Sequence, residues 1–405
     1  MVKTAGFTFA SRLAGAMLSF GLIILISQWL GSQVRGVCGF YLVIIATTTA
    51  ISDIAGGATV PFLIRYFPAS RLLRGQMGWA IIPAFLVPLC FFFLSAISVT
   101  EFLLLAVAGW LNSTWSVQQQ LLLGFKKFAA FNLMTIAIPT FSIAGFVVFY
   151  VAGFRSSLSY LTSIGLAFLM ATLSGFFLLG NAIKNQSLNM PRQKSRVIFQ
   201  KGLQNQLAHL ASLLNSRLIF FVMPAASLGL WSNTLTMAEA FFLIPGSLGQ
   251  VAYGLVAGKN KLEDKKNVFQ KAWWTNLTVL IPCLLIALLI PDRFWQWLFG
   301  DDFTGIAGLL KLAIPGIGLY SLYLLVSYRQ SASGNFKYNF YAVLAGLTIN
   351  LVATGIMLLS GNYTLTGGIM ALVLGWGIAS AVALSGLQRT NPIAFQSFFR
   401  LPFHK

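Results

Sequence analysis

A succession of apolar segments, each close to the ~20 residues that a helix needs to cross a bilayer, restricts what this 405-residue chain can fold into. Short polar loops separate these segments, so each apolar run is soon followed by another. Roughly twelve segments are long enough to span. The predicted spans are Gly6–Trp29, Val37–Val60, Gly78–Ser98, Phe102–Leu123, Phe131–Gly153, Leu158–Ala182, Gly202–Val222, Gly229–Ala257, Ala272–Pro291, Gly305–Ser331, Tyr338–Ser360 and Leu365–Leu387.

The composition agrees with a membrane protein and excludes a soluble one. The chain is 57% hydrophobic and 9% charged, with a mean hydropathy of +0.80, whereas about a quarter of a typical soluble domain is charged. The first apolar stretch runs directly into a second, which predicts a spanning helix rather than a cleaved signal peptide. The sequence therefore predicts an all-α polytopic membrane protein.

The net charge of +19 is distributed in a pattern that predicts orientation. Lys and Arg fall mainly in alternate short loops, which is the positive-inside pattern of membrane proteins, so no nucleic-acid partner is expected. The opposite loops hold few basic residues and several acids, so both termini are predicted to be cytoplasmic. These opposite loops contain Arg35, Glu101, Arg155, Asp292, Arg293, Asp301 and Asp302.

The two halves of the chain show signs of an internal repeat. Leu30-Gly31 closes the first segment and Leu228-Gly229 the seventh, while Phe131-Asn132 opens the fifth and Tyr338-Asn339 the eleventh. Six spans per half start both halves on the same side, which gives a parallel repeat with a site between the halves. The predicted parts are a six-helix bundle at 1–184, a cytoplasmic linker at 185–201, a pseudo-symmetric six-helix bundle at 202–387 and a cytoplasmic tail at 388–405.

At least four ionisable side chains fall inside the predicted spans, where each costs on the order of 3 kcal/mol at the bilayer centre. Arg12 and Asp53 are expected at similar heights in the first two spans, and Arg217 and Glu239 can approach each other in the next bundle. One interpretation is two ion pairs that join neighbouring helices. The other is function: Arg suits bidentate contact with phosphate, and the acids are candidates for ion coupling or gating.

Polar side chains recur on one face of the seventh span and predict a hydrated cavity. Asn205, His209, Ser212 and Ser216 are spaced as i, i+4, i+7 and i+11, so they share a helix face. Gln118 belongs to a second polar run, in the fourth span. Such groups either bind substrate or form hydrogen bonds between helices. His209 is either a proton carrier or simply hydrogen-bonded.

Several functions lack their sequence signatures. No Gly-rich loop ends in Gly-Lys-Ser/Thr, so no ATP-driven motor is expected. Cys38, Cys90 and Cys283 lie in or beside apolar segments, without metal-ligand spacing or a disulfide framework. No cluster of His, Cys and carboxylates predicts a metal centre. We therefore expect no catalytic residues, no metal and no cofactor, and the chain is not predicted to be an enzyme.

Short motifs follow one another through nearly all of the spans in an order typical of a known family. With them the chain resembles the polysaccharide transporters of the multidrug/oligosaccharidyl-lipid/polysaccharide exporter superfamily, of the O-antigen flippase type. The motifs are Ser11-Arg12, Leu30-Gly31, Arg35-Gly36, Tyr41, Leu123-Gly124, Phe128, Asn132, Lys201-Gly202-Leu203, Leu214-Asn215-Ser216-Arg217, Leu228-Gly229-Leu230-Trp231, Ala238-Glu239, Pro245, Leu248, Leu298-Phe299-Gly300, Phe303, Pro315-Gly316 and Lys337-Tyr338-Asn339.

The resemblance implies a V-shaped pair of bundles around a central cavity, which alternates access in the bacterial inner membrane. The implied substrate is an undecaprenyl-pyrophosphate-linked oligosaccharide, with membrane lipids, a glycan polymerase and other assembly proteins as partners. Cationic cavity residues of the family meet the pyrophosphate, and Arg12 and Arg217 match them by position. The family pattern Asn-Tyr-Arg-(Leu)-Asp reads Asn215-Ser216-Arg217-Leu218-Ile219 here, without its acid.

Three other functions remain as alternatives. A drug or cation antiporter of the same superfamily is expected to carry surplus acid inside the membrane, whereas the acids here are matched by Arg. A membrane enzyme, such as a polysaccharide polymerase or ligase, needs a sizeable outward loop with catalytic side chains. A scaffold for glycan-assembly partners has no need of charges inside the membrane.

Overall fold

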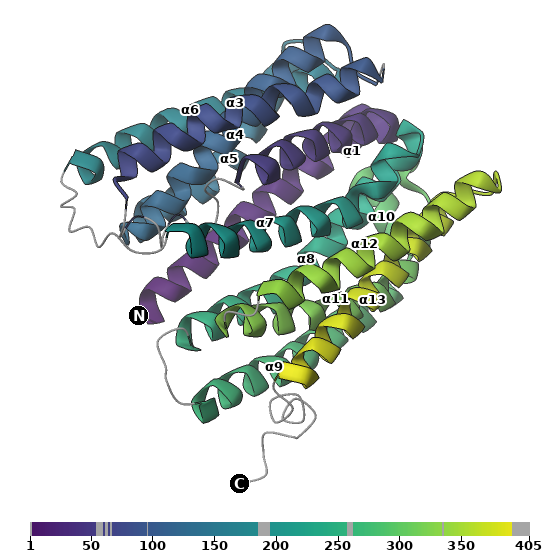
Figure 1. The fold of residues 1–405 in the computed structure, drawn as a ribbon. Coiled ribbons are helices and arrows are strands. Elements are labelled where there is room, and N and C mark those ends of the chain that lie inside the picture. Colours follow the sequence, from purple (N-terminus) through teal and green to yellow (C-terminus); the bar gives the residue numbers. More distant parts are fainter. Residues whose placement is uncertain are drawn as a thin grey trace. The chain divides into compact units, whose positions relative to one another are not determined.

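The chain forms long helices throughout the part that the computed structural model describes, residues 2–53, 60, 64, 67–94, 96–184, 195–256, 262–333 and 336–390 (Figure 1). Nine helices of this part are long and apolar enough to cross a membrane. The prediction of an all-α polytopic membrane protein is therefore confirmed for the described residues.

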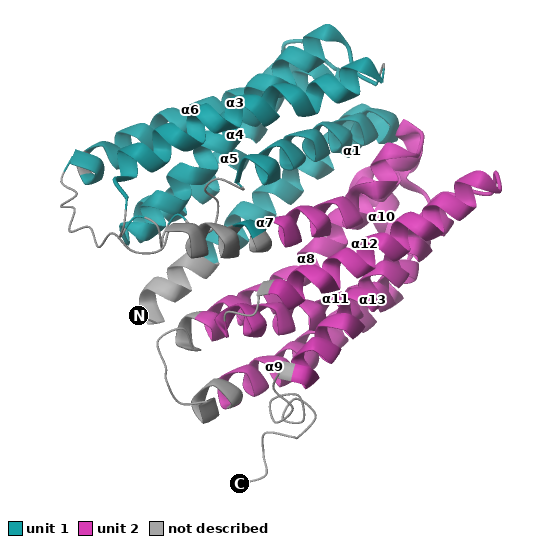
Figure 2. Ribbon diagram, in the orientation of Figure 1, with its two compact units in different colours: residues 1–206 teal, residues 207–405 magenta. Residues whose placement is uncertain are grey.

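The helices divide into two compact units, residues 1–206 and residues 207–405 (Figure 2). Helix α7 (Ser195–Arg217) crosses the division. Unit 1 also holds α1 (Val2–Ser52), α3 (Ala69–Phe93), α4 (Val99–Gly124), α5 (Phe128–Val151) and α6 (Ser157–Lys184). Unit 2 holds η3 (Leu218–Phe221), α8 (Ala225–Val256), α9 (Leu262–Leu289), α10 (Asp292–Phe299), η4 (Asp301–Phe303), α11 (Ile306–Ala332), α12 (Phe336–Leu359) and α13 (Leu365–Thr390).

Helix α1 is 51 residues long, about twice what a bilayer requires, and it breaks at Gly31. Gly31 has φ 76° and ψ 179°, a conformation that side chains with a Cβ disfavour. Figure 1 shows the chain bending back at this break. The loop expected between the first two spans is therefore a single glycine. The second span was predicted to reach Val60, but the described helix ends at Ser52, and 54–59 lie outside the described residues.

Several helices begin before their predicted spans, and α3 is one example. Helix α3 begins at Ala69, nine residues before the predicted Gly78. Arg71 and Arg74 fall between two predicted spans, but both lie in the first turns of α3, where a helix can extend beyond the apolar core into the headgroup region. The predicted outer loop after α9 also contains a short helix, α10. Charged residues in the sequence therefore indicate where a span leaves the apolar core of the membrane, but not where its helix begins or ends.

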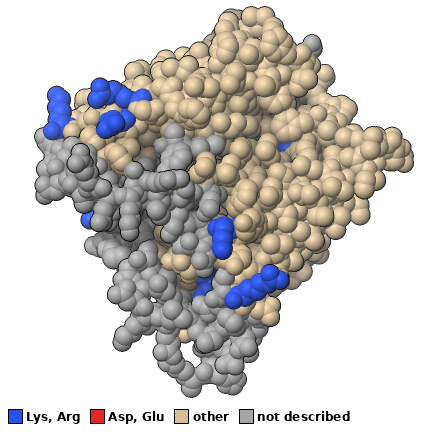
Figure 3. Space-filling model, viewed as in Figure 1, with Lys and Arg blue, Asp and Glu red and all other residues tan. Residues whose placement is uncertain are grey.

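The core of unit 1 joins the first arm of α1 to α4, α5 and α6. Trp29 stacks on Tyr150 of α5 with ring centroids 4.3 Å apart, and Leu105 and Phe146 are fully buried beside them. Other large apolar side chains point outward, as Phe177 does, because lipid chains are as apolar as a protein core. Broad areas of the face in Figure 3 carry no charged side chain, which suits contact with lipid.

In unit 2, α12 and α13 approach each other closely through small residues. A Cβ on Gly346 would lie 2.5 Å from the carbonyl oxygen of Gly375, and a Cβ on Gly375 would lie 2.8 Å from that of Gly346. Only glycine fits at both positions without moving a backbone. Close backbone packing of this kind stabilises helix pairs in membranes, where no hydrophobic force distinguishes a neighbouring helix from lipid.

Candidate functional site

The polar contacts of α7 define the candidate site in unit 2. Helix α7 is not among the nine apolar spans, and hydrogen bonds tie its second half to three other helices. Ser212 Oγ lies 2.5 Å from Tyr320 OH on α11. Asn350 Nδ2 of α12 donates to both the backbone oxygen and Oδ1 of Asn215, each at 2.9 Å. Arg217 completes the set with a contact to α8, and in lipid such bonds hold a polar helix in its bundle.

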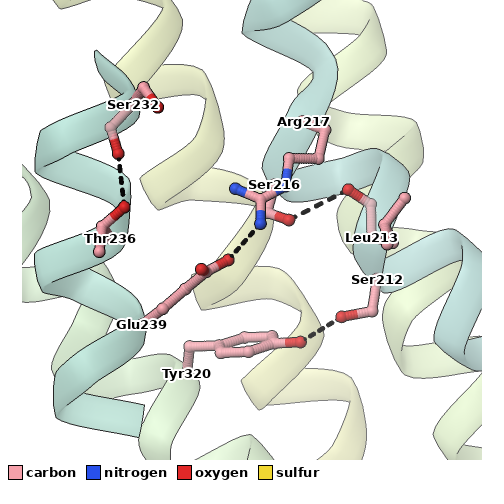
Figure 4. A network of polar contacts seen from close by, with 8 residues as sticks. All are labelled: Ser212, Leu213, Ser216, Arg217, Ser232, Thr236, Glu239 and Tyr320. Carbon is pink, nitrogen blue, oxygen red and sulfur yellow. Dashed lines mark hydrogen bonds and ion pairs between the residues drawn. The ribbon is translucent and has the colours of Figure 1, made fainter. Parts of the chain in front are cut away.

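The contact between α7 and α8 is an ion pair. Arg217 Nη2 lies 2.6 Å from Glu239 Oε1 (Figure 4). Arg217 is in the last turn of α7, where its charge also favours the carbonyl end of the helix, and Glu239 stands near the middle of α8. The predicted approach of these two residues is confirmed.

The pair is only partly covered by protein. Its side chains are 21% exposed for Arg217 and 45% exposed for Glu239. The contact engages Nη2, and a guanidinium carries five N–H donors in a planar fork, so the same side chain can meet a second anion. The guanidinium carbon lies 6.0 Å from the ring centroid of Phe220, which limits its movement on that side.

The polar face of α7 leads up to this pair. His209 is exposed. Ser216 is half-buried with its hydroxyl donating to the Leu213 oxygen at 3.0 Å, and Ser212 contacts Tyr320 (Figure 4). Asn205 lies on α7 as well, but its side chain is outside the described part of the structure. The face predicted from the sequence therefore exists over its described positions, next to Arg217.

Aromatic rings behind this face were missed by the sequence analysis. The Tyr320 ring lies 5.0 Å from that of Tyr323, 5.4 Å from that of Trp376 and 5.1 Å from that of Phe242. Tyr320 and Tyr323 are three residues apart on α11 and so share one side of the helix, which is the only local signal the sequence gives. The rings of Tyr320, Tyr323 and Trp376 are buried, and this packing fixes the Tyr320 hydroxyl that contacts Ser212 of α7.

Asp53 in unit 1 contacts a neutral side chain, whereas Glu239 in unit 2 contacts an arginine. Asp53 directly follows the last residue of α1, and its Oδ2 accepts a hydrogen bond from Ser116 Oγ of α4 at 3.2 Å. Its Oδ1 is buried and has no hydrogen-bond partner among the described residues. One turn earlier, Asn112 Nδ2 donates to Thr49 Oγ1 at 2.8 Å, which ties α4 to α1.

Of the two ion pairs considered from the sequence, only one forms among the described residues. Arg12 is half-buried on α1, and the contact of Asp53 is with Ser116 rather than with Arg12. Similar depth in the membrane brings two residues together only if their helix faces point toward each other. For Asp53 the facing side chain comes from α4, so the ion pair with Arg12, one of the two interpretations of the sequence, does not form in this structure.

The polar run of α4 forms links between helices. Gln118 is fully buried, and its Nε2 donates to the Thr172 oxygen of α6 at 3.1 Å. A Cβ on Gly175 would lie 2.1 Å from Gln118 Oε1, so the glycine makes room for the amide. Gln119 Nε2 donates to Thr135 Oγ1 of α5 at 3.0 Å. Contact of Gln118 with substrate stays a prediction, and it requires this side chain to leave its bond to α6.

Solved structures share the fold of this chain at low sequence identity. A multidrug resistance MATE family transporter of the MOP superfamily, in an inward-facing conformation, matches with a TM-score of 0.66 and 13% identity, over 97% of this chain and 100% of its own. The lipid II flippase MurJ, in an inward closed conformation, matches with a TM-score of 0.69 and 14% identity, over 96% of this chain and 88% of its own. A MOP superfamily transporter from Pyrococcus furiosus gives a TM-score of 0.61 at 15% identity, over 98% and 97% of the two chains.

The chain thus has the fold of MOP superfamily transporters, and the proteins that share it are transporters and flippases rather than enzymes. No protein-family profile and no curated protein matches the sequence. The predicted resemblance is confirmed for the fold of the superfamily. At these identities the likeness does not extend to a substrate, so the polysaccharide type belongs to the proposal that follows.

Proposed function

We propose that this protein is a flippase that moves an undecaprenyl-pyrophosphate-linked oligosaccharide across the bacterial inner membrane by alternating access. Its membrane topology would comprise twelve spans in two six-helix bundles, with both termini in the cytoplasm. The described helices support this number. Helix α1 counts as two spans that meet at Gly31, and the helices α4 and α7 add to the nine apolar spans.

The observation that carries the proposal is a partly exposed Arg217 at the end of α7, paired with Glu239 of α8 in unit 2. A charge inside a membrane span is costly, and neighbouring helices can be joined at lower cost, as the amides of Asn215 and Asn350 join α7 to α12. A guanidinium with donors to spare suits the diphosphate of a lipid-linked sugar. His209 and Ser216 would line the approach to it.

The remaining site residues take secondary roles in this proposal. Arg12, in unit 1, would offer a guanidinium to an anionic group of the substrate. Glu239 would hold Arg217 in place until the substrate anion displaces it, and so act in gating. Asp53 would bind the coupling ion. Asn205 and Gln118 would contact the glycan through their amides.

A drug or cation antiporter is the second candidate, and one observation favours it. Asp53 is contacted by the neutral Ser116 and has a buried oxygen without a hydrogen-bond partner among the described residues. A carboxylate in that setting attracts a cation, whether it is a coupling ion or a substrate. Export of a cationic dye from cells that express the protein would separate the two candidates.

The decisive experiment follows the lipid-linked glycan in a deletion strain, with its leaflet probed from outside. We expect undecaprenyl-linked oligosaccharide to build up on the cytoplasmic leaflet and to clear when the wild-type gene returns. Arg217→Ala should fail to clear it although the protein reaches the membrane. Lys311→Ala, which alters an exposed cation on α11, is the matched control and should clear it. An unchanged pool in the deletion strain would overturn the flippase proposal.

A further inference from the structure

Helix α10 joins α9 to α11 and packs against unit 2 along one side. Trp295 and Phe299, four residues apart on that side, are buried, and their rings stack with centroids 6.2 Å apart. Phe299 continues the contact to Phe303 of η4 at 5.9 Å. An aromatic core therefore fixes this short helix to the rest of unit 2.

The ends of α10 are also held by hydrogen bonds. The carboxylate of Asp292 accepts from the backbone N–H of Gly305 at 2.6 Å and from that of Ala307 at 3.0 Å, at the start of α11. Gly300 and Gly305 have φ values of 104° and 93°, which lets the chain turn sharply on each side of η4. The helix consequently has a fixed direction and fixed sides.

A second side of α10 is aromatic and open. Trp297 is 74% exposed and Phe294 is 39% exposed, and their ring centroids lie 5.9 Å apart. The exposed apolar side of α9 leads up to them and ends at Leu289, which is 82% exposed. No charged residue lies between Leu289 and Pro291. The exposed apolar residues of α9 are therefore followed, in α10, by the exposed rings of Phe294 and Trp297.

The third side of α10 is polar. Arg293 is exposed, and Gln296 donates from Nε2 to Thr304 Oγ1 at 3.3 Å. At 3.6 residues per turn, Gln296 lies next to Asp292 around the helix, and Arg293 lies between Gln296 and Trp297. Both polar side chains therefore point away from the buried Trp295. The helix thus presents a protein side, a water side and an apolar side, which is the arrangement of a helix that lies along a membrane surface.

We propose that α10 is an interfacial helix that inserts Phe294 and Trp297 among phospholipids at the boundary between head groups and acyl chains. Eight residues rise roughly 12 Å, far less than the roughly 30 Å of the apolar core, so α10 cannot span. Aromatic side chains prefer that boundary. The occupant is phospholipid because the exposed rings prolong the lipid-facing side of α9. This anchor holds the α9–α11 hairpin at a set depth, whatever the transported substrate is.

Spin labels test where the exposed rings lie. In a variant whose native cysteines, Cys38, Cys90 and Cys283, are replaced by Ala, single labels are introduced through Trp297→Cys and, as the matched control on the polar side, Gln296→Cys. The full-length protein is placed in nanodiscs of phosphatidylcholine and phosphatidylglycerol. We expect the label at 297 to collide several-fold more with oxygen than with a water-soluble nickel complex, and the label at 296 to show the reverse. Equal accessibility at both positions would overturn the proposal.

A second measurement tests the anchor itself. A label at Leu289→Cys reports the depth of the end of α9, with and without the pair of changes Phe294→Ser and Trp297→Ser. We expect its depth to shift by several ångströms in the changed protein, provided that the protein still elutes as a single species. An unchanged depth would overturn the anchoring role. Protection of position 297 from oxygen in native membranes, but not in nanodiscs, would show that a protein covers α10 and would also overturn it.

Discussion

Each half of the chain has one carboxylate within its predicted spans, Asp53 in unit 1 and Glu239 in unit 2, and the two are held in different ways. In unit 2, Glu239 meets the guanidinium of Arg217 at 2.6 Å. In unit 1, Asp53 meets the hydroxyl of Ser116 at 3.2 Å. An ion pair supplies its own countercharge, whereas a hydroxyl supplies one hydrogen bond and no charge. Unit 2 is therefore the better place to receive an anion, and unit 1 the better place to receive a cation or a proton.

Removal of the cation in unit 2 should have the largest effect. Arg217→Ala takes away the diphosphate donor and leaves Glu239 without its countercharge. A lost charged contact of this kind is worth about 3 kcal/mol, so we expect transport to fall on the order of 100-fold. The rate at which lipid-linked glycan reaches the outer leaflet measures it. Glu239→Ala in addition should restore the amount of folded protein without restoring transport, and restored transport would reduce the pair to a structural link.

An exchange of the charges of Arg217 and Glu239 tests whether the position of the guanidinium matters as well as the ion pair. In Arg217→Glu with Glu239→Arg, the ion pair is kept and the guanidinium moves from α7 to α8. We expect normal amounts of protein in the membrane, with transport at least about 10-fold lower because the cation has left the polar face of α7. Transport at the wild-type level would mean that the pair matters only for packing.

Neutralisation of the acid in unit 1 should act on coupling. Asp53→Asn keeps a group that can accept from Ser116 but removes the charge, so we expect transport to fall roughly 10-fold and to lose its response to an imposed proton or sodium gradient. Proteoliposomes with each gradient measure this response. A gradient response that survives in Asp53→Asn would place coupling elsewhere.

Glu101→Gln is the matched control for that experiment, because Glu101 caps the start of α4 just before the predicted fourth span. Burial raises the pKa of Glu101, but hydrogen bonds from Tyr41 and Ser98 outweigh it, so the pKa lies below its ordinary value. This acid is therefore ionised at neutral pH and engaged locally. Its replacement should lower stability somewhat and leave the gradient response intact.

The smallest effect is expected from a change that touches only packing in unit 2. Gly346→Ala forces a Cβ against the Gly375 backbone and should destabilise the protein by about 1–3 kcal/mol. The melting temperature in detergent measures it. Gly355→Ala on the same helix meets nothing within 4 Å and should leave that temperature unchanged or slightly higher. Equal melting temperatures for both variants would mean that α12 and α13 adjust freely.

The sequence predicted features that depend on periodicity and depth. Apolar length located the spans, and helical spacing placed His209, Ser212 and Ser216 beside Arg217 on α7. The same approach failed for Asp53, because its partner Ser116 comes from a helix that is sequence-distant and contributes an ordinary serine. Helix α10 was missed since Asp292 and Arg293 mark a loop by composition, and only the buried Trp295 and Phe299 reveal a folded element. Contacts between segments that are distant in the sequence depend on how the helices pack, and no local sequence pattern reveals this packing.

The break at Gly31 joins the two arms of α1 through a single residue, and that residue has only two soft backbone torsions. Arg12 lies on the segment of α1 before Gly31, and Asp53 directly follows the end of the segment after it. Two helix segments joined by a single residue cannot slide along each other as helices joined by a long loop can. Any change in the angle between the arms must therefore come from the φ and ψ of Gly31, so ligands bound at Arg12 and at Asp53 would act on opposite sides of the same hinge.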